Sequence, residues 1–121
     1  QSLSEEIDKG QVIGAAVQGY GWCTMEDLQW DALGRYTSAN PSTYKIPGIR
    51  DLPEHFEVEL LPSASQEASV FGSKAVGEPP LIYGLAVFFA LQDAVQAASP
   101  HAQLSHPATP EALLKALLNR E

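Results

Sequence analysis

The chain has 121 residues, and its composition and charge exclude several classes of protein. At this length it forms one domain and buries only a modest core, so a large cofactor site needs additional chain. Apolar residues make up 45% of the sequence, which predicts a folded protein because disordered chains have too few of them. The net charge of −8, with only seven Lys and Arg, argues against a nucleic acid partner, since phosphate binding requires clustered cations.

Neither a membrane span nor a secretory signal is expected. Residues 81–91 are the most apolar stretch, which is about half of the roughly 20 residues that a bilayer requires, and the stretch ends at the polar pair Gln92 and Asp93. The first nine residues lack a basic segment followed by an apolar one. The single cysteine, Cys23, forms no internal disulfide and indicates a reducing compartment. We therefore expect a cytoplasmic protein.

A long helix is predicted from Ser4 to about residue 27, because Ser4 can cap it and acidic residues follow in its first turn. One face of this helix is small and amide-bearing where a core helix would carry Leu or Ile, so it can approach a polar group closely. The alternative is tight backbone packing around Gly10, Gly14 and Gly21. A second, apolar stripe is expected to dock the helix. The first face consists of Gln11, Gly14, Ala15 and Gln18, and the second of Val12, Ala16, Tyr20 and Cys23.

Two regions predict short strands. Residues 29–44 have a turn at 31–34 and a break at Asn40-Pro41, which indicates a β-hairpin or irregular β structure. Residues 55–61 alternate in part, with apolar Phe56 and Val58 on one face and acidic residues on the other, as in a half-buried strand.

Two further helices complete an expected α+β fold. Pro79 and Pro80 favour the first turn of a helix over residues 79–98, which is apolar nearly all round and therefore resembles the buried central helix of a larger body. Thr109-Pro110-Glu111 provides a cap, an initial proline and an acidic first turn for a short amphipathic helix through residue 118.

Glu78 is the strongest candidate for chemistry. It lies between residues 74–77 and the apolar helix that begins with Pro79. Burial raises the pKa of a carboxyl group and a helix N-terminus lowers it, a balance that can leave an ionised but reactive base. The alternative is an ordinary acidic helix cap, and the residues alone favour that alternative.

The motif GSKAVGEPPL (residues 72–81) resembles the signature that precedes the C-terminal helix in the xanthine dehydrogenase and aldehyde oxidase family of molybdenum hydroxylases. Three other segments are similar to this family in the same order: QVIGAAVQGYGW (11–22), PSTYKIP (41–47) and PATP (107–110). Together they extend over most of the chain. The resemblance implies that residues 1–121 are the C-terminal segment of a molybdopterin-binding domain, as an excised fragment or as one chain of a split subunit.

The resemblance also implies roles for individual residues. Glu78 matches the family's catalytic base, which accepts a proton while purines, other N-heterocycles or aldehydes are hydroxylated with oxygen from water. Gln11 matches a glutamine whose amide lies beside the molybdenum ligands, and the backbone at Val76 and Gly77 is expected near the pterin, since a missing side chain allows close approach. No residue of the chain is expected to bind the metal directly.

The implied cofactor is molybdenum-molybdopterin, bound in the intact enzyme and not by this chain alone. The implied partners are the remainder of the molybdopterin-binding subunit and the iron–sulfur and flavin subunits or domains. The isolated chain is expected to lack turnover and to self-associate through exposed apolar surface. A non-catalytic, acidic α+β interaction module derived from the same family is the alternative, and an unrelated α+β domain is a third.

Overall fold

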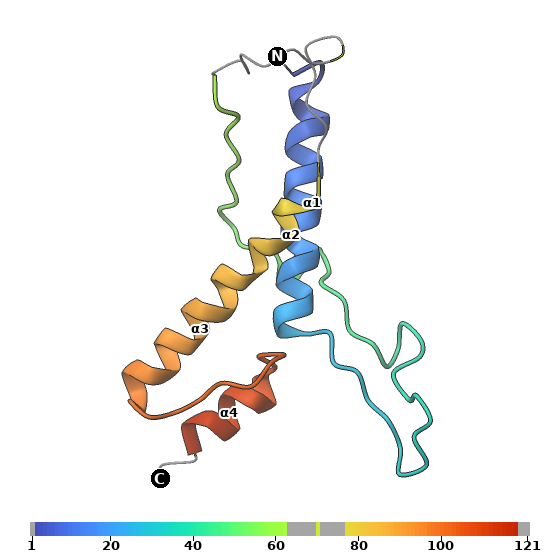
Figure 1. Ribbon diagram of the computed structural model, residues 1–121, viewed down its shortest axis with the longest axis vertical. Helices are drawn as coiled ribbons and strands as arrows, with labels where there is room; N and C mark the ends of the chain where they lie inside the picture. The colour runs from blue at the N-terminus through green and yellow to red at the C-terminus, as the bar shows by residue number, and fades with distance from the viewer. Residues whose placement is uncertain (1, 63–69, 71–76, 119–121) are drawn as a thin grey trace.

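The computed structural model describes residues 2–62, 70 and 77–118, and helices dominate this part of the chain. Helix α1 (Glu5–Thr24) stands at the centre of the molecule, and α2 (Pro79–Ile82) crosses it (Figure 1). Helix α3 (Gly84–Ala98) continues from α2 away from α1, and α4 (Pro110–Leu118) returns beneath α3 (Figure 1). A short 3₁₀ turn, η1 (Ile49–Asp51), lies in the long connection between α1 and α2.

Helix α1 begins where the sequence predicts. The Ser4 hydroxyl accepts a hydrogen bond from the Ile7 N–H at 3.5 Å, and acidic residues occupy the first turn, where they favour the helix N-terminus. The helix ends at Thr24, three residues earlier than predicted, because the Met25 and Glu26 N–H groups both donate to the Gly21 carbonyl. The predicted long N-terminal helix is confirmed.

The expected α+β class is wrong: no strand is present among residues 2–62, 70 and 77–118. The predicted hairpin reduces to one isolated antiparallel bridge between Trp30 and Tyr36. The Asp31 carboxylate accepts hydrogen bonds from the N–H groups of Leu33 and Arg35, both at 2.9 Å. These local bonds close a tight turn and satisfy donors that a longer ladder would have used.

The second predicted strand is also absent. Residues 55–61 run as an extended segment, in which Val58 is half-buried while Phe56 and Glu57 are exposed, but no described segment pairs with them (Figure 1). A strand requires a neighbour at about 4.8 Å to form its ladder. The alternation of apolar and acidic residues therefore predicted the extended conformation correctly, but the predicted strand is wrong.

The apolar helix over residues 79–98 is present, but it is broken and exposed. Tyr83 separates α2 from α3, and its N–H donates to the Pro80 carbonyl at 3.2 Å, an i→i+3 bond that tightens the turn. Only Pro80, Gly84 and Val95 are buried in the two helices, so the described part of this chain does not itself cover the helix that was expected to be buried in a larger body. By length and composition Pro79–Ala98 is apolar enough to cross a membrane, with a mean hydropathy of 1.5, but the break at Tyr83 interrupts it.

The apolar core lies between α3, α4 and the connection that joins them. Gln92 ties this connection to α3: its side chain accepts from the Leu104 N–H at 2.8 Å and donates to the Ala102 carbonyl at 3.1 Å. Helix α4 begins as predicted, since the Thr109 hydroxyl accepts from the Ala112 N–H at 3.2 Å. The buried residues are Val95, Ala102, Leu104, Ala108 and Ala116.

The C-terminal end of α1 packs against the same connection. The Ala108 N–H donates to the Cys23 carbonyl at 2.7 Å, and the His106 ring lies between those of Trp22 and Phe88, with centroids 4.8 and 5.8 Å away. Burial raises the pKa of the Cys23 thiol.

The described helices leave much of the molecule uncovered. A compact monomer of this mass, 13.0 kDa, exposes about 6,300 Å² by the usual scaling of surface with mass, whereas the chain exposes 9633 Å². Large apolar side chains such as Ile82, Tyr83 and Phe89 are more than half exposed. By itself, the chain does not bury the apolar surface that its sequence contains.

Candidate functional site

Glu78 is the residue immediately before α2. Its carbonyl accepts a hydrogen bond from the Leu81 N–H at 3.0 Å, which closes the first turn of the helix. Its side chain is exposed and does not cap the helix. The ordinary acidic cap considered above is therefore not its role in this structure. The partial burial expected from the sequence is not provided by the described residues.

The position of α2 is fixed by direct backbone contact with α1. A methyl group added at Gly19 would lie 2.0 Å from the Leu81 carbonyl oxygen and 3.2 Å from the Gly84 nitrogen. A methyl group added at Gly84 would lie 2.2 Å from the Gly19 carbonyl carbon. Both glycines are buried, so the helices cross with no side chain between them. Leu81, which makes the contact with Gly19, is the third residue after Glu78.

Gln11 lies on the open face of α1. Gln11, Gly14 and Gln18 are exposed, and a methyl group added at Gly14 would meet no atom within 4 Å. The small, amide-bearing face predicted from the sequence is thus accessible. Of the three glycines for which tight packing was the alternative, only Gly21 is closely packed, and its neighbour is a side chain: an added methyl group there would lie 2.4 Å from Pro47 Cδ.

The described residues do not bring Gln11 and Glu78 into contact. Gln11 is eight residues before Gly19, or about 12 Å along the helix axis at 1.5 Å per residue. No hydrogen bond joins it to Glu78 within the described part of the chain. Gly77 is exposed, and an added methyl group there would approach Pro79 Cδ at 3.3 Å. Val76 lies outside the described residues.

A cavity of about 550 Å³ lies on the opposite side of α1, between this helix, the extended segment and the turn at Tyr83. Its floor is part of the apolar stripe of α1 that was expected to dock the helix. The alternating segment contributes Phe56 and Val58 to the wall. The sequence contained both patterns, but it did not indicate that they face each other. The stripe residues at the cavity are Val12, Ala16 and Tyr20.

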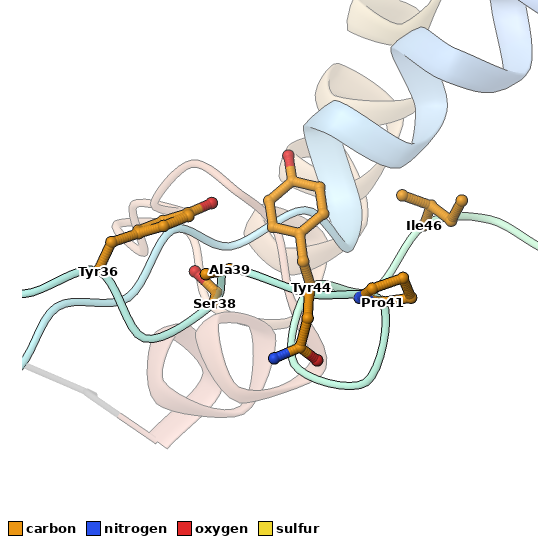
Figure 2. A pocket seen from close by; sticks show the side chains of 7 residues that line it. Tyr36, Ser38, Ala39, Pro41, Tyr44 and Ile46 are labelled. Atoms are coloured by element: carbon orange, nitrogen blue, oxygen red, sulfur yellow. The ribbon is translucent and has the colours of Figure 1, made fainter.

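A smaller cavity, of about 310 Å³, is formed by the PSTYKIP region itself. Figure 2 shows Tyr36, Ser38, Pro41 and Ile46 around it, with the Tyr44 ring pointing toward the end of α1. The Tyr44 hydroxyl donates a hydrogen bond to Glu26 Oε2 at 2.6 Å. The tyrosine therefore joins the motif to the segment that directly follows α1, a contact that the sequence did not indicate.

Comparison with known proteins identifies the family to which these residues belong. A family model described as "Molybdopterin cofactor-binding domain" matches residues 1–53. The xanthine dehydrogenase/oxidase of Rattus norvegicus is 43% identical over 127 aligned residues, which cover 98% of this chain and 10% of that protein. The xanthine dehydrogenases of Dictyostelium discoideum and Drosophila subobscura are 48% and 46% identical, each over 80% of this chain and 7% of the relative.

The chain belongs to the xanthine dehydrogenase family. The family resemblance of its motifs is thereby confirmed, and an unrelated domain is excluded. The chain spans about a tenth of the length of the xanthine dehydrogenases that it matches. The family model contains Gln11 and the PSTYKIP motif, whereas Glu78 lies beyond it, inside the region aligned with the rat xanthine dehydrogenase/oxidase.

The described residues on the open face of α1 fit the approach of a polar group such as a molybdopterin cofactor. The open face of α1 offers an exposed amide at Gln11 beside an unobstructed backbone at Gly14, which a polar cofactor could approach. Within residues 2–62, 70 and 77–118, no group of three or more His, Cys, Asp or Glu side chains could hold a metal ion.

Proposed function

We propose that this chain supplies the proton-accepting end of a molybdenum hydroxylase, with Glu78 as the catalytic base. The observation that carries the proposal is the exposed Glu78 carboxylate, anchored three residues from a backbone-to-backbone helix crossing, in a chain 43% identical to a xanthine dehydrogenase/oxidase. The substrates are purines, other N-heterocycles or aldehydes, with water as the source of oxygen.

Each site residue has a limited task in this proposal. Glu78 accepts a proton at a carboxylate oxygen from the water-derived nucleophile, which is general base catalysis. The Gln11 amide donates a hydrogen bond to the cofactor, and the backbone at Val76 and Gly77 borders the pterin. The molybdenum-molybdopterin group supplies the redox chemistry when it is bound, while the protein contributes orientation and electrostatics.

We further propose that residues 1–121 are the C-terminal segment of a larger, cytoplasmic molybdopterin-binding subunit. The exposed surface of 9633 Å² and the tenfold greater length of the relatives support a large covering partner. That partner is the remainder of the subunit, and iron–sulfur and flavin domains or subunits carry the electrons away. The isolated chain lacks most of this site and does not turn over.

The decisive experiment compares Glu78→Gln with the unmutated intact enzyme. The substitution keeps the shape of the side chain and removes the base, so kcat should fall by roughly 10²- to 10⁴-fold while molybdenum stays bound. Glu54→Gln is the matched control, because Glu54 is an exposed acid that lines neither cavity. Retained turnover in Glu78→Gln, with full molybdenum content, would refute the catalytic role.

The second candidate is a non-catalytic interaction module of the same family. The acidic balance and the exposed apolar side chains favour it, because both suit a docking surface. Molybdenum analysis of the unmutated intact protein separates the two candidates. A folded protein that never contains molybdenum supports the interaction module.

A further inference from the structure

We infer that Gly19 and Gly84 are positioning residues for Glu78: because these two glycines have no side chains, the backbone that carries Glu78 is held at a fixed distance from α1. This inference rests on the proposed function of Glu78 as a base. It concerns the backbone contacts of α1 with Leu81 of α2 and with Gly84, the first residue of α3, which neither the family match nor the motif assigns to catalysis.

The contact leaves no room for adjustment by side chains. An added Cβ at Gly19 would lie 2.0 Å from the Leu81 carbonyl oxygen and 3.0 Å from its carbon, and one at Gly84 would lie 2.7 Å from the Gly19 Cα. All of these atoms are backbone. Because a real Cβ is essentially never closer than 3.0 Å to such an atom, α2 must move by at least the difference of 3.0 and 2.0, or 1.0 Å, to admit one methyl group.

The movement is carried to Glu78 because the link between them is stiff. Leu81 is the third residue after Glu78, and its N–H donates to the Glu78 carbonyl at 3.0 Å. The two residues between them are Pro79 and Pro80, whose rings lock φ. The two locked φ angles and this hydrogen bond leave few backbone rotations that could absorb a shift of Leu81, so most of the shift is passed to the Glu78 backbone.

Displacements of this size matter for a base. Proton transfer needs heavy atoms about 2.6–3.2 Å apart, and a misplacement of about 1 Å can reduce the rate about 100-fold. The crossing consequently acts on turnover through Glu78, without touching substrate or cofactor. Substrate binding does not depend on the carboxylate position in the same way, so KM should change little.

The test uses Gly19→Ala in the intact enzyme, with turnover expressed per bound molybdenum. We expect kcat to fall about 100-fold with KM within about twofold, and the crystal structure of the variant to show α2 and Glu78 displaced by about 1 Å from α1. Gly10→Ala is the matched control: it is also a glycine of α1, but a methyl group there meets nothing within 4 Å, so kcat should be unchanged. Unchanged kcat in Gly19→Ala with α2 displaced overturns the inference.

A double substitution separates positioning from general damage. In the Glu78→Gln background no base remains to be misplaced, so adding Gly19→Ala should lower the residual rate by no more than about threefold. A further loss of about 100-fold overturns the inference. If Glu78→Gln alone retains full turnover, the proposed function fails and the positioning role fails with it. If Glu78→Gln is inactive and Gly19→Ala is active, only the positioning role fails.

Pro79→Ala provides a second route if Gly19→Ala yields no folded enzyme. Pro79 is exposed at the first position of α2, where alanine is also well tolerated, so the fold is retained. The substitution leaves the crossing intact and releases one locked φ between it and Glu78. The inference requires kcat to fall roughly threefold or more at unchanged KM. Unchanged kcat overturns it.

Discussion

The Tyr44 hydroxyl donates a hydrogen bond to Glu26 Oε2 across 2.6 Å, and this bond joins two segments that are 18 residues apart in the sequence. Beside it, Gly21 of α1 packs so closely on Pro47 that no side chain fits between them. The PSTYKIP segment is thus held at the C-terminal end of α1 by a polar and an apolar contact. Both contacts lie within the region that matches the molybdopterin-binding family model.

Tyr44→Phe should lower the free energy of unfolding by about 1 kcal/mol at neutral pH. Hydrogen bonds to charged acceptors contribute more than this when they are buried, and the partial exposure of this pair reduces the effect. Denaturant titration of the two proteins measures it. Tyr36→Phe is the control, because it also loses a phenol oxygen but has no hydrogen bond to another described residue. Equal losses in the two variants would contradict a specific role of the Glu26 contact.

The stability that Tyr44 contributes should disappear at high pH. The hydrogen bond to Glu26, and then desolvation and repulsion by the Glu26 charge, raise the pKa of Tyr44 to about 12 from its ordinary value of 10.0. The folded state therefore holds this proton more tightly than the unfolded state, so the contribution is complete below pH 10 and is lost as the pH rises toward 12. The difference in unfolding free energy between the unmutated chain and Tyr44→Phe should be constant from pH 7 to 9 and should shrink above pH 10. A difference that grows above pH 10 would mean that the sign of the pKa shift is wrong.

The capping residues at the N-terminal ends of the helices allowed the sequence to predict where α1 and α4 begin. Ser4 and Thr109 carry the cap that starts α1 and α4, and such signals act within one helical turn, so they can be recognised without a structure. The strand over residues 55–61 could not be decided in this way, because alternation reports an extended conformation and only a neighbouring strand turns it into a sheet. The fold class was wrong for that reason.

In the candidate site, too, the sequence indicated local features but not the contacts between distant segments. The motif made Glu78 the candidate base, and that role stays a prediction. Nothing in the sequence distinguished Gly19 and Gly84 from the glycines at which the chain is open, such as Gly10 and Gly14. Backbone contact between helices depends on how they are placed in space, and a glycine carries no periodic signal of its own. The sequence did not predict the cavity between the apolar stripe of α1 and the extended segment. The stripe was explained as the docking face of a helix and the alternation as one face of a strand, so neither pattern pointed to a shared cavity.

Thr109→Ala should destabilise the chain by about 1 kcal/mol, because it leaves the Ala112 N–H at the start of α4 without its acceptor. The loss should appear in thermal unfolding and in faster exchange of the amide hydrogens of α4. Ser105→Ala removes a hydroxyl from an exposed position of the same connection and is the matched control. If both variants lose the same stability, the effect belongs to the connection and not to the cap.

Val95→Ala should cost about 2 kcal/mol, since Val95 is only 3% exposed and lies at the centre of the core between α3 and α4. Leu118→Ala removes a larger side chain, but Leu118 is 69% exposed at the end of α4, so its loss should stay within about 0.5 kcal/mol. The comparison is made by denaturant unfolding of each variant. A larger loss for Leu118→Ala would mean that the core is elsewhere.

The isolated chain should self-associate through the apolar side chains that α2 and α3 expose. Ile82, Tyr83 and Phe89 are each more than half exposed and lie within eight residues of one another, and covering such a surface removes apolar area from water. The weight-average mass in sedimentation equilibrium should therefore rise with concentration. Phe89→Ser should weaken the association by roughly tenfold or more, as expected for one large side chain.

Leu33→Ser is the control for this last experiment, because Leu33 is 78% exposed in the Asp31 turn, far along the chain from α2 and α3. Association that responds equally to the two substitutions would be non-specific. Since Pro79–Ala98 is also apolar enough to cross a membrane, the same samples should be mixed with neutral phospholipid vesicles. Binding that removes the chain from solution would show that a bilayer covers this surface, and would contradict a docking role toward the rest of the subunit.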